Sequence, residues 1–306
     1  MDGALILDKA EGISSHSAVL AVRRLLSEPR IGHLGTLDPF ACGVLVLLLG
    51  KATRLARFYR DRDKTYRGTI RFGYSTDSYD STGTPTSPDR KPTLDEDELR
   101  RLFGEFVGTQ LQQPPALSAK KIGGVRAYRL ARRGQMPALN AVSVTIHELE
   151  LLSIDGPFVG IRVRASSGTY VRSLAHELGM RMRVGAHLAQ LRRTAVGEFV
   201  EAAAVSLEQL ETRKQQGVVP LIPMETLLPE FPALALPSFL ADLVSNGNPV
   251  ALEGSEQWVR LLDASGTLRG IAERTSDGLY HPLVVFPTSP CQQPAGRVAN
   301  SGRNLP

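Results

Sequence analysis

An aspartate in a loop that contains glycine and proline is the residue of this sequence best suited to chemistry. The loop spans residues 32–39 and reads GHLGTLDP. Pro39 restricts the backbone of Asp38 to extended conformations, and the two glycines allow the chain to approach another group closely. A carboxylate fixed in this way can act as a nucleophile or a base. Because aspartates also cap turns in such loops, the residues alone leave both interpretations of Asp38 open.

Two further segments are candidates for substrate contact. His33 is suited to proton transfer, to contact with a phosphate or a base, or to a hydrogen bond with the backbone. Residues 166–172 (SSGTYVR) lead from a predicted strand into a predicted helix, where backbone N–H groups can hold a phosphate or simply begin the helix. The six histidines form no HxxxH pair and the two cysteines form no CxxC pair, so the sequence predicts no metal site.

The segment 112–137 is strongly basic and contains no acidic residue. Lysine and arginine side chains neutralise phosphates, and the aromatic ring of Tyr128 in the same segment can stack on a base. A face that merely contacts solvent normally mixes both signs of charge, so the absence of acids favours a nucleic-acid partner. The basic residues are Lys120, Lys121, Arg126, Arg129, Arg132 and Arg133.

The charge of the chain is unevenly distributed. Its 306 residues carry a net charge of +5, but residues 1–229 carry +7 and residues 230–290 carry −4. The most apolar run, residues 40–50, is shorter than the roughly 18 residues that a membrane span needs, and the acidic N-terminus is unlike a signal peptide. Only two cysteines occur, far apart in sequence, which fits a reducing cytoplasm.

Alternating and helical patterns predict the elements that must position Asp38. Residues 44–49 and 65–76 read as strands, and residues 142–146 and 161–165 read as two more strands of a hairpin that turns at 155–157. One helix begins after Ser14 and Ser15, one begins at a capping box formed by Thr93 and Glu96, and a third spans residues 173–182. These elements predict an α/β fold of the α+β kind.

Four prolines between residues 221 and 237 predict a boundary to a small terminal module. The module shows short strands at 258–262, 267–271 and 279–286, separated by tight turns. We therefore expect a main domain over residues 1–228, a β-rich domain over 229–290, and a disordered tail over 291–306.

Seven stretches, in order, resemble motifs of the bacterial tRNA pseudouridine synthase B (TruB) family. The resemblance covers about residues 4–200, and three positions depart from the usual pattern, at Ala10, Cys42 and Leu117. The stretches are LDK with GISS at 7–15, GHLGTLDP at 32–39, KTY at 64–66, TDSYDSTG at 76–83, QPPALSAK at 113–120, SGTYVR at 167–172 and LRR at 191–193.

The resemblance implies a pseudouridine synthase catalytic domain with a mixed, mainly antiparallel sheet, followed by a PUA-like RNA-binding domain. It implies that Asp38 is the nucleophile, that Tyr66 stacks under the target base and accepts its C5 proton, and that Arg172 pairs with Asp38. The basic insert, about residues 112–137, corresponds to a mobile thumb that closes on RNA.

The resemblance also implies a set of RNA contacts. His33 corresponds to a histidine that stacks where the base flips out, and Tyr170 and Leu191 correspond to residues that shape the pocket. The full set of expected RNA-binding residues is Lys9, His33, Lys120, Lys121, Arg126, Tyr128, Arg132, Tyr170, Leu191 and Arg192.

The implied reaction isomerises uridine 55 in the T-loop of tRNA to pseudouridine without a cofactor or metal. The N1–C1′ bond breaks, the base turns, and C5 bonds to C1′. The base must flip out because the reacting bond is hidden in the folded loop. Whether Asp38 attacks C1′, attacks C6 or assists a glycal route stays open. The expected enzyme is a cytoplasmic monomer that binds the T-arm without a guide RNA or an obligate protein partner.

Two other functions fit the same scaffold. The first is a non-catalytic RNA-binding protein or tRNA-folding chaperone, an activity that can also accompany catalysis. The second is a pseudouridylase that depends on a guide RNA. The presence of Asp38, Tyr66 and Arg172 together favours an enzyme over a pure binder, and the lack of a long lysine-rich extension argues against guide dependence.

Overall fold

A computed structural model describes residues 1–115, 121–122, 125–126 and 140–286. The chain forms two compact units, Met1–Ile222 and Pro223–Pro306. The division falls inside the proline-containing stretch where the sequence predicts a boundary. The predicted domain limits stay predictions, and the predicted tail lies outside the described residues.

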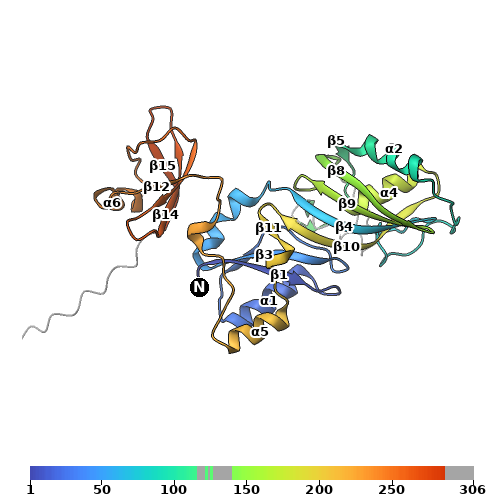
Figure 1. Cartoon of the computed structure of the whole chain (residues 1–306), viewed down its shortest axis with the longest axis horizontal. Helices are drawn as coiled ribbons and strands as arrows, with labels where there is room; N and C mark the ends of the chain where they lie inside the picture. The colour runs from blue at the N-terminus through green and yellow to red at the C-terminus, as the bar shows by residue number, and fades with distance from the viewer. Residues whose placement is uncertain (116–120, 123–124, 127–139, 287–306) are drawn as a thin grey trace, which may run out of the picture. The chain divides into compact units, whose positions relative to one another are not determined.

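A mixed sheet forms the centre of the first unit (Figure 1). Among the described residues it has nine strands, in the order β1-β3-β10-β4-β9-β8-β5, with β2 paired to β3 and β11 to β10. All neighbours are antiparallel except β10 and β3. The strands are β1 (Gly3–Lys9), β2 (Ile31–His33), β3 (Cys42–Leu49), β4 (Lys64–Phe72), β5 (Gly108–Gln112), β8 (Val142–Asp155), β9 (Phe158–Ala165), β10 (Ala186–Val196) and β11 (Phe199–Val200).

The parallel pairing of β10 and β3 is short. Its register joins Arg192 to Cys42 and Arg193 to Gly43. Gly43 has φ 99°, and a Cβ atom there would lie 2.3 Å from the carbonyl oxygen of Arg193. Only glycine therefore permits this close approach between the two strands.

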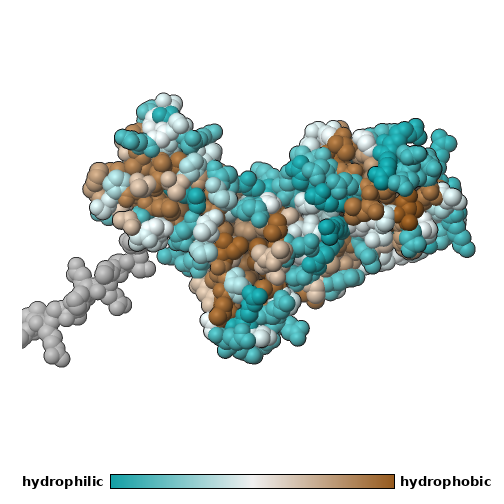
Figure 2. All heavy atoms as spheres, viewed as in Figure 1, coloured by the Kyte–Doolittle hydropathy of each residue, from teal (hydrophilic) through white to brown (hydrophobic). Residues whose placement is uncertain are grey.

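Helices pack against the sheet and create two hydrophobic cores. The helices α1 (Ser15–Leu26) and α5 (Leu207–Gln215) share one core with β1 and β3. The helices α2 (Glu96–Phe106) and α4 (Val171–Arg181) share the other with β4, β8, β9 and β10. The outer side of α2 is hydrophilic (Figure 2), as an amphipathic surface helix requires.

Local signals in the sequence locate most of these elements. Ser14 caps α1 as predicted, since its Oγ accepts a hydrogen bond from the Ser17 N–H at 3.0 Å. The capping box predicted from Thr93 and Glu96 is wrong. Asp95 caps α2 instead, accepting from the Glu98 N–H at 2.8 Å, because aspartate is as good an N-cap as threonine and stands next to the first helical residue.

Two strand predictions also change. The strand predicted to reach residue 76 ends at Phe72, where Gly73 takes φ 120° and turns the chain. The first residues of the GHLGTLDP loop are not loop but part of the short strand β2. The predicted hairpin of β8 and β9 is confirmed, with Asp155 paired to Phe158 at its end.

Shorter elements complete the described chain. A long 3₁₀ helix, η1 (Gly50–Tyr59), follows β3, and β6 (Lys121–Ile122) pairs with β7 (Val125–Arg126) inside the basic insert. The remaining 3₁₀ helices are η2 (Glu201–Ala203), η3 (Met224–Thr226) and η4 (Ser238–Leu240). No helix of the part of the chain described here is long and apolar enough to cross a membrane.

The second unit is β-rich, as predicted. Its sheet has the order β12-β13-β14-β15, and the short helix α6 (Ala241–Ser245) packs near β14 and β15. The strands are β12 (Ala233–Ala235), β13 (Trp258–Leu262), β14 (Leu268–Arg274) and β15 (Tyr280–Val285). Its core includes the buried side chains of Val259, Leu261 and Tyr280.

The packing of α4 on β10 yields a stability prediction. A Cβ atom on Gly179 would lie 2.1 Å from the Ala186 backbone nitrogen, whereas one on Gly104 in α2 would meet nothing within 4 Å. We expect Gly179→Ala to lower the free energy of unfolding by about 3 kcal/mol. The matched Gly104→Ala should raise it by about 0.5 to 1 kcal/mol, since alanine favours a helix over glycine. Chemical denaturation measures both, and equal effects would contradict the close packing.

Candidate active site

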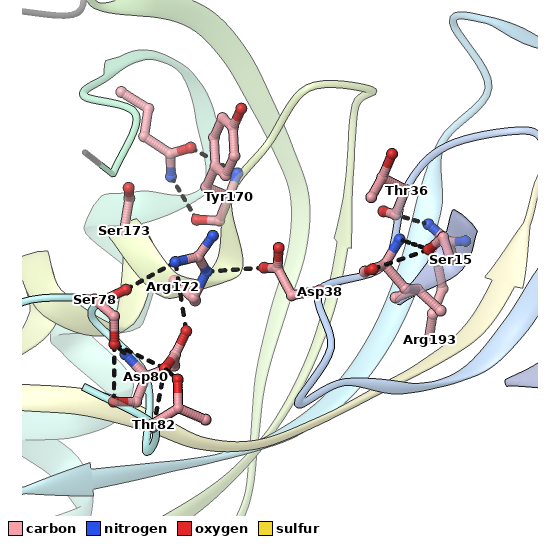
Figure 3. Close-up of polar contacts among 12 residues, drawn as sticks. Ser15, Thr36, Asp38, Ser78, Asp80, Thr82, Tyr170, Arg172, Ser173 and Arg193 are labelled. Atoms are coloured by element: carbon pink, nitrogen blue, oxygen red, sulfur yellow. Dashed lines mark hydrogen bonds and ion pairs between the residues drawn. The ribbon is translucent and has the colours of Figure 1, made fainter. Parts of the chain in front are cut away.

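The loop that carries Asp38 lies between β2 and β3 and is fixed by a buried serine. The Ser15 Oγ, at the start of α1, donates to the Leu37 carbonyl at 2.9 Å and accepts from the Leu37 N–H at 2.8 Å. Ser15 is 2% exposed, so these bonds are shielded from water. Because Leu37 precedes Asp38 directly, the serine fixes the backbone from which the carboxylate projects (Figure 3).

A buried arginine supports the same loop. Arg193 on β10 is 1% exposed and donates to the carbonyls of Val44 at 2.8 Å and Gly35 at 3.0 Å. It also donates to the Thr36 carbonyl at 3.4 Å (Figure 3). Burial lowers the pKa of its guanidinium, while the Tyr66 hydroxyl beside it acts in the opposite direction. The guanidinium N–H groups take the place of the backbone N–H donors that these carbonyls would have in a regular sheet. Arg193 carries no predicted role, although it stands in the LRR motif.

Lys9 has a comparable structural position, which corrects its assignment as an RNA contact. Its side chain is fully buried, and its ammonium donates to the carbonyls of Ala10 at 2.9 Å, Ile13 at 2.8 Å and Pro39 at 3.5 Å. Burial lowers its pKa, and the nearby Cys42 and Asp38 act in the opposite direction. An ammonium with three carbonyl partners and no exposed surface holds the loop and does not present itself to RNA.

Asp38 forms an ion pair with Arg172. The Asp38 Oδ2 lies 2.9 Å from the Arg172 Nε (Figure 3). The Arg172 side chain is 4% exposed and that of Asp38 is 38% exposed, so the carboxylate faces an accessible space while its partner is buried. Arg172 lies in the first turn of α4, two residues after the SGTY stretch. The structure thus joins two predicted residues that are far apart in the sequence.

A second carboxylate, which carries no predicted role, contacts the same guanidinium. The Arg172 Nη1 donates to the Ser78 carbonyl at 2.8 Å and lies 3.4 Å from the Asp80 Oδ2. The other Asp80 oxygen accepts from the Ser78 Oγ at 2.7 Å, the Thr82 N–H at 3.0 Å and the Thr82 Oγ1 at 2.6 Å. A buried guanidinium needs such partners, since an unpaired buried charge is very costly. The sequence signal that points to Asp80 is its position within the TDSYDSTG motif.

A cavity of about 510 Å³ opens beside Asp38. Asp38 and Arg172 lie at one side of it, and the nearly buried Tyr66 and Leu191 supply apolar surface. Lys64 also lines it, where burial and the charge of Arg193 lower its pKa to about 8. Apolar walls next to a fixed carboxylate suit a flat heterocycle that reacts with that carboxylate.

Tyr170 lines the cavity from the N-terminus of α4 and is held by the first residue of the basic insert, Gln112. The buried Gln112 side chain accepts from the Tyr170 N–H at 2.8 Å and donates to the Tyr170 carbonyl at 3.1 Å. Ser173 donates to the Gln113 carbonyl at 2.7 Å, and Pro114 lines the cavity. The insert therefore begins at the wall of the site.

Arg192, which is predicted to contact RNA, lies outside this group. Side chains alternate along β10, so Arg192 faces the side of the sheet opposite Leu191 and Arg193. There its guanidinium meets the Asp8 carboxylate at 2.9 and 3.1 Å and the Glu201 carboxylate at 3.0 Å, and these contacts raise its pKa.

The remaining predicted RNA contacts stay predictions. His33 lies half-buried in β2, paired with Leu47, and is not among the described residues that line the cavity. Lys121 and Arg126 pair across β6 and β7, and only their backbone is described. Lys120, Tyr128 and Arg132 lie outside the described residues. Within those residues, no group of three or more histidine, cysteine and acidic side chains could hold a metal ion.

Three family models match consecutive parts of the chain. The model described as TruB family pseudouridylate synthase (N terminal domain) matches residues 23–171. The tRNA pseudouridylate synthase B C-terminal domain matches residues 172–229. The model described as Pseudouridine synthase II TruB, C-terminal, matches residues 232–286. The last two matches meet near the described division into two units.

Curated relatives match over nearly the whole length. Proteins named tRNA pseudouridine synthase B from Solibacter usitatus, Thermobifida fusca and Aquifex aeolicus are 43%, 41% and 40% identical to this chain. The alignments cover 94%, 93% and 83% of this chain, and 100%, 98% and 88% of the respective relatives.

Solved structures share the fold. A chain of a Cbf5–Nop10–Gar1 complex has a TM-score of 0.70 at 26% identity, covering 93% of this chain and 85% of its own. A chain of an H/ACA RNP bound to a substrate RNA containing 2′-deoxyuridine has a TM-score of 0.71 at 24% identity, covering 93% of this chain and 84% of its own.

The neighbouring arginines of β10 provide a matched test of the loop support. Arg193→Met removes the donor for two loop carbonyls and one carbonyl of β3, so we expect the free energy of unfolding to fall by about 3 kcal/mol. Arg192→Met removes ion pairs that are more than a third exposed, so its loss should stay below about 1 kcal/mol. Urea denaturation measures both values. Equal losses would show that Arg193 does not support the loop.

Proposed function

This chain belongs to the TruB family of pseudouridylate synthases, and from that premise we propose that it converts uridine 55 in the T-loop of tRNA to pseudouridine. The observation that carries the proposal is the half-exposed Asp38 carboxylate, paired with buried Arg172 at the side of a cavity walled by Tyr66 and Leu191. The pair requires the carboxylate in its charged form, which is the form that can attack carbon or stabilise developing positive charge.

The cavity residues have distinct parts in the proposed reaction. The flipped uracil lies against Tyr66, which accepts the C5 proton, while Leu191 and Tyr170 exclude water around the ring. The N1–C1′ bond breaks, and the C5–C1′ bond forms after the detached base has turned. Arg172 keeps Asp38 oriented throughout. Nothing in this sequence of steps calls for a cofactor, and the choice among C1′ attack, C6 attack and a glycal route belongs to experiment.

A row of cations on η1 supports an RNA substrate. Basic residues occur at every third position from 51 to 60, and a 3₁₀ helix has three residues per turn, so they align along one edge about 6 Å apart. Such a row suits the regularly spaced phosphates of an RNA strand. The Lys64 ammonium, which lines the cavity, donates to the Arg60 carbonyl at 3.5 Å, so the row ends beside the cavity. The residues are Lys51, Arg54, Arg57 and Arg60.

The row carries no predicted role because its three-residue period is neither that of an α-helix nor that of a strand. The three arginines are exposed and Lys51 is half-buried. Within the described part of the chain, Lys51, Arg57 and Arg60 make no ion pair. The repeat K-x-x-R-x-x-R-x-x-R is the signal that would have revealed them.

The choice of partner forms part of the same proposal. Relatives named tRNA pseudouridine synthase B are about 40% identical, whereas the chain of the Cbf5–Nop10–Gar1 complex is 26% identical, which favours action on tRNA without a guide RNA. We place the enzyme in the cytoplasm as a monomer. A tRNA-folding chaperone activity that accompanies catalysis, closure of the insert on the T-arm, and RNA binding by a PUA-like second unit stay predictions.

The central test compares Asp38→Asn with the wild-type chain on unmodified tRNA transcript. We expect one pseudouridine, at position 55, from the wild type in buffer without guide RNA or added metal. Asp38→Asn keeps the shape of the loop but removes the charge, so we expect the single-turnover rate to fall by roughly 10⁴-fold with tRNA affinity unchanged. Chemical mapping of pseudouridine measures the product.

The matched control is Asp97→Asn, an exposed carboxylate in α2. It should retain the wild-type rate within about twofold. Product from Asp38→Asn at the wild-type rate would remove the nucleophile assignment, and no product from the wild type would remove the proposed activity. A chaperone role would show as tRNA refolding by Asp38→Asn.

A second test addresses the row on η1. Replacing Lys51, Arg57 and Arg60 by alanine should weaken tRNA binding and flatten the slope of log Kd against log salt by about 2 to 3, as expected for that number of phosphate contacts. Filter binding across a salt series measures the slope.

The control for this variant removes the same charge from elsewhere. Alanine at Arg24, Arg101 and Arg213, exposed on α1, α2 and α5, should leave the slope unchanged. If both triple variants alter the slope equally, general charge attracts the RNA and the row makes no specific contact.

A further inference from the structure

The segment that supplies Asp80 rests on α4 through an aromatic pair. The Tyr79 ring stacks on the His176 ring with centroids 3.9 Å apart and an angle of 10° between the planes. Neither ring lines the cavity, and neither position has a predicted role. Tyr79 nevertheless lies between Ser78 and Asp80, the two residues of the segment that contact Arg172.

Tyr79 has a strained backbone. Its φ is 64°, in the left-handed region, which is unfavourable for a bulky residue other than glycine. This conformation lets both neighbours of Tyr79 address one guanidinium, the Ser78 carbonyl at 2.8 Å and the Asp80 carboxylate at 3.4 Å. Strain of this kind persists only where surrounding contacts hold it. Stacking on His176 is such a contact.

The helix positions explain why one pair can serve this purpose. His176 follows Arg172 by four residues, so both side chains lie on the same face of α4, one turn apart. Arg172 binds the Ser78 carbonyl and the Asp80 carboxylate of the segment, and His176 stacks on the Tyr79 ring between them. Burial lowers the pKa of His176, so the imidazole is neutral when it stacks.

The other side of the segment is fixed to the sheet. The Leu188 N–H donates to the Tyr79 carbonyl at 2.9 Å, and the Ser81 N–H donates to the Leu188 carbonyl at 3.0 Å. The segment therefore spans from β10 to α4, and the ring pair is its apolar contact beside the polar network of Arg172. Loss of the stack leaves the hydrogen bonds to Leu188 of β10 intact. It removes the contact that holds Ser78 and Asp80 near the Arg172 guanidinium.

We propose that Tyr79 and His176 are positioning residues for the reaction: their stack holds Ser78 and Asp80 against Arg172, and Arg172 in turn fixes the Asp38 carboxylate. This inference rests on the proposed function of the cavity. It goes further by assigning a role to two residues that touch neither substrate nor the reacting atoms. A purely structural stack would affect stability alone, whereas a positioning stack changes the rate of the chemical step at unchanged affinity.

The test measures single-turnover pseudouridine formation and tRNA affinity for two variants of one residue. His176→Ala removes the stack, and we expect a rate about tenfold lower with the Kd for tRNA unchanged. His176→Phe keeps a ring in the same place, and we expect it to restore the rate to within about twofold of wild type. Loss of rate in both variants alike would overturn the role of stacking.

A double-mutant cycle identifies the route of the effect. Asp80→Asn weakens the contact through which the stack is proposed to act, so adding His176→Ala should cost much less than tenfold in that background. An undiminished tenfold loss would show that the stack acts elsewhere and would overturn the inference.

A second substitution separates positioning from folding. Tyr79→Gly removes the ring but accepts the left-handed backbone without strain, so the protein should stay folded while the rate falls about tenfold. The matched control is Tyr74→Leu, which removes the ring that lies 4.6 Å from His187 in the same unit, and it should keep the wild-type rate.

The two proposals fail in different ways. A wild-type chain that forms no pseudouridine overturns the proposed function and this inference with it. A wild-type chain that is active, together with a His176→Ala or Tyr79→Gly variant that loses thermal stability but no rate, overturns this inference alone.

Discussion

The buried guanidinium of Arg172 is the interaction on which the site depends. It joins the loop after β2, the segment around Asp80 and the first turn of α4, which are distant in the sequence. Two carboxylates of unlike exposure share it. Asp80 is enclosed and fully hydrogen-bonded, whereas Asp38 keeps its exposed side toward the cavity. The enclosed carboxylate offsets the cost of burying the cation, which leaves the accessible one free to react.

The same principle governs the loop itself. A loop that runs through a protein interior carries carbonyl groups that no ladder satisfies. Here Arg193 donates to the carbonyls of Gly35 and Thr36, and Lys9 donates to that of Pro39. Ser15 adds a two-way bond to the residue before Asp38. Side chains that look like RNA ligands or ordinary surface charges in the sequence are thus internal supports. The cations that we propose to contact RNA lie instead on η1 and in the insert.

The sequence was informative where the cause of structure is local. A continuous apolar run located β3, alternation located the β8–β9 hairpin, and short strands between tight turns located the sheet of the second unit. Ser14 marked the start of α1. The motifs identified Asp38, Tyr66, Tyr170, Arg172 and Leu191, which the structure gathers around one cavity. Burial of Lys9, the sheet face of Arg192 and the contact of Asp80 with Arg172 depend on pairings between distant segments. No local pattern encodes those pairings, so the residue types alone could not show whether a basic side chain supports the fold or binds RNA.

The short parallel pairing between β10 and β3 has a consequence for how the site comes into being. Each half of the sheet has its own core, one around β1 and β3 and the other around β4, β8 and β9. The seam between them is narrow, with Gly43 seated against the backbone of Arg193. Asp38 enters from the edge of one half, while Tyr66 and Arg172 belong to the other. Each half packs around its own core, yet neither contains a complete site. The reactive centre therefore exists only where the two halves of the sheet join.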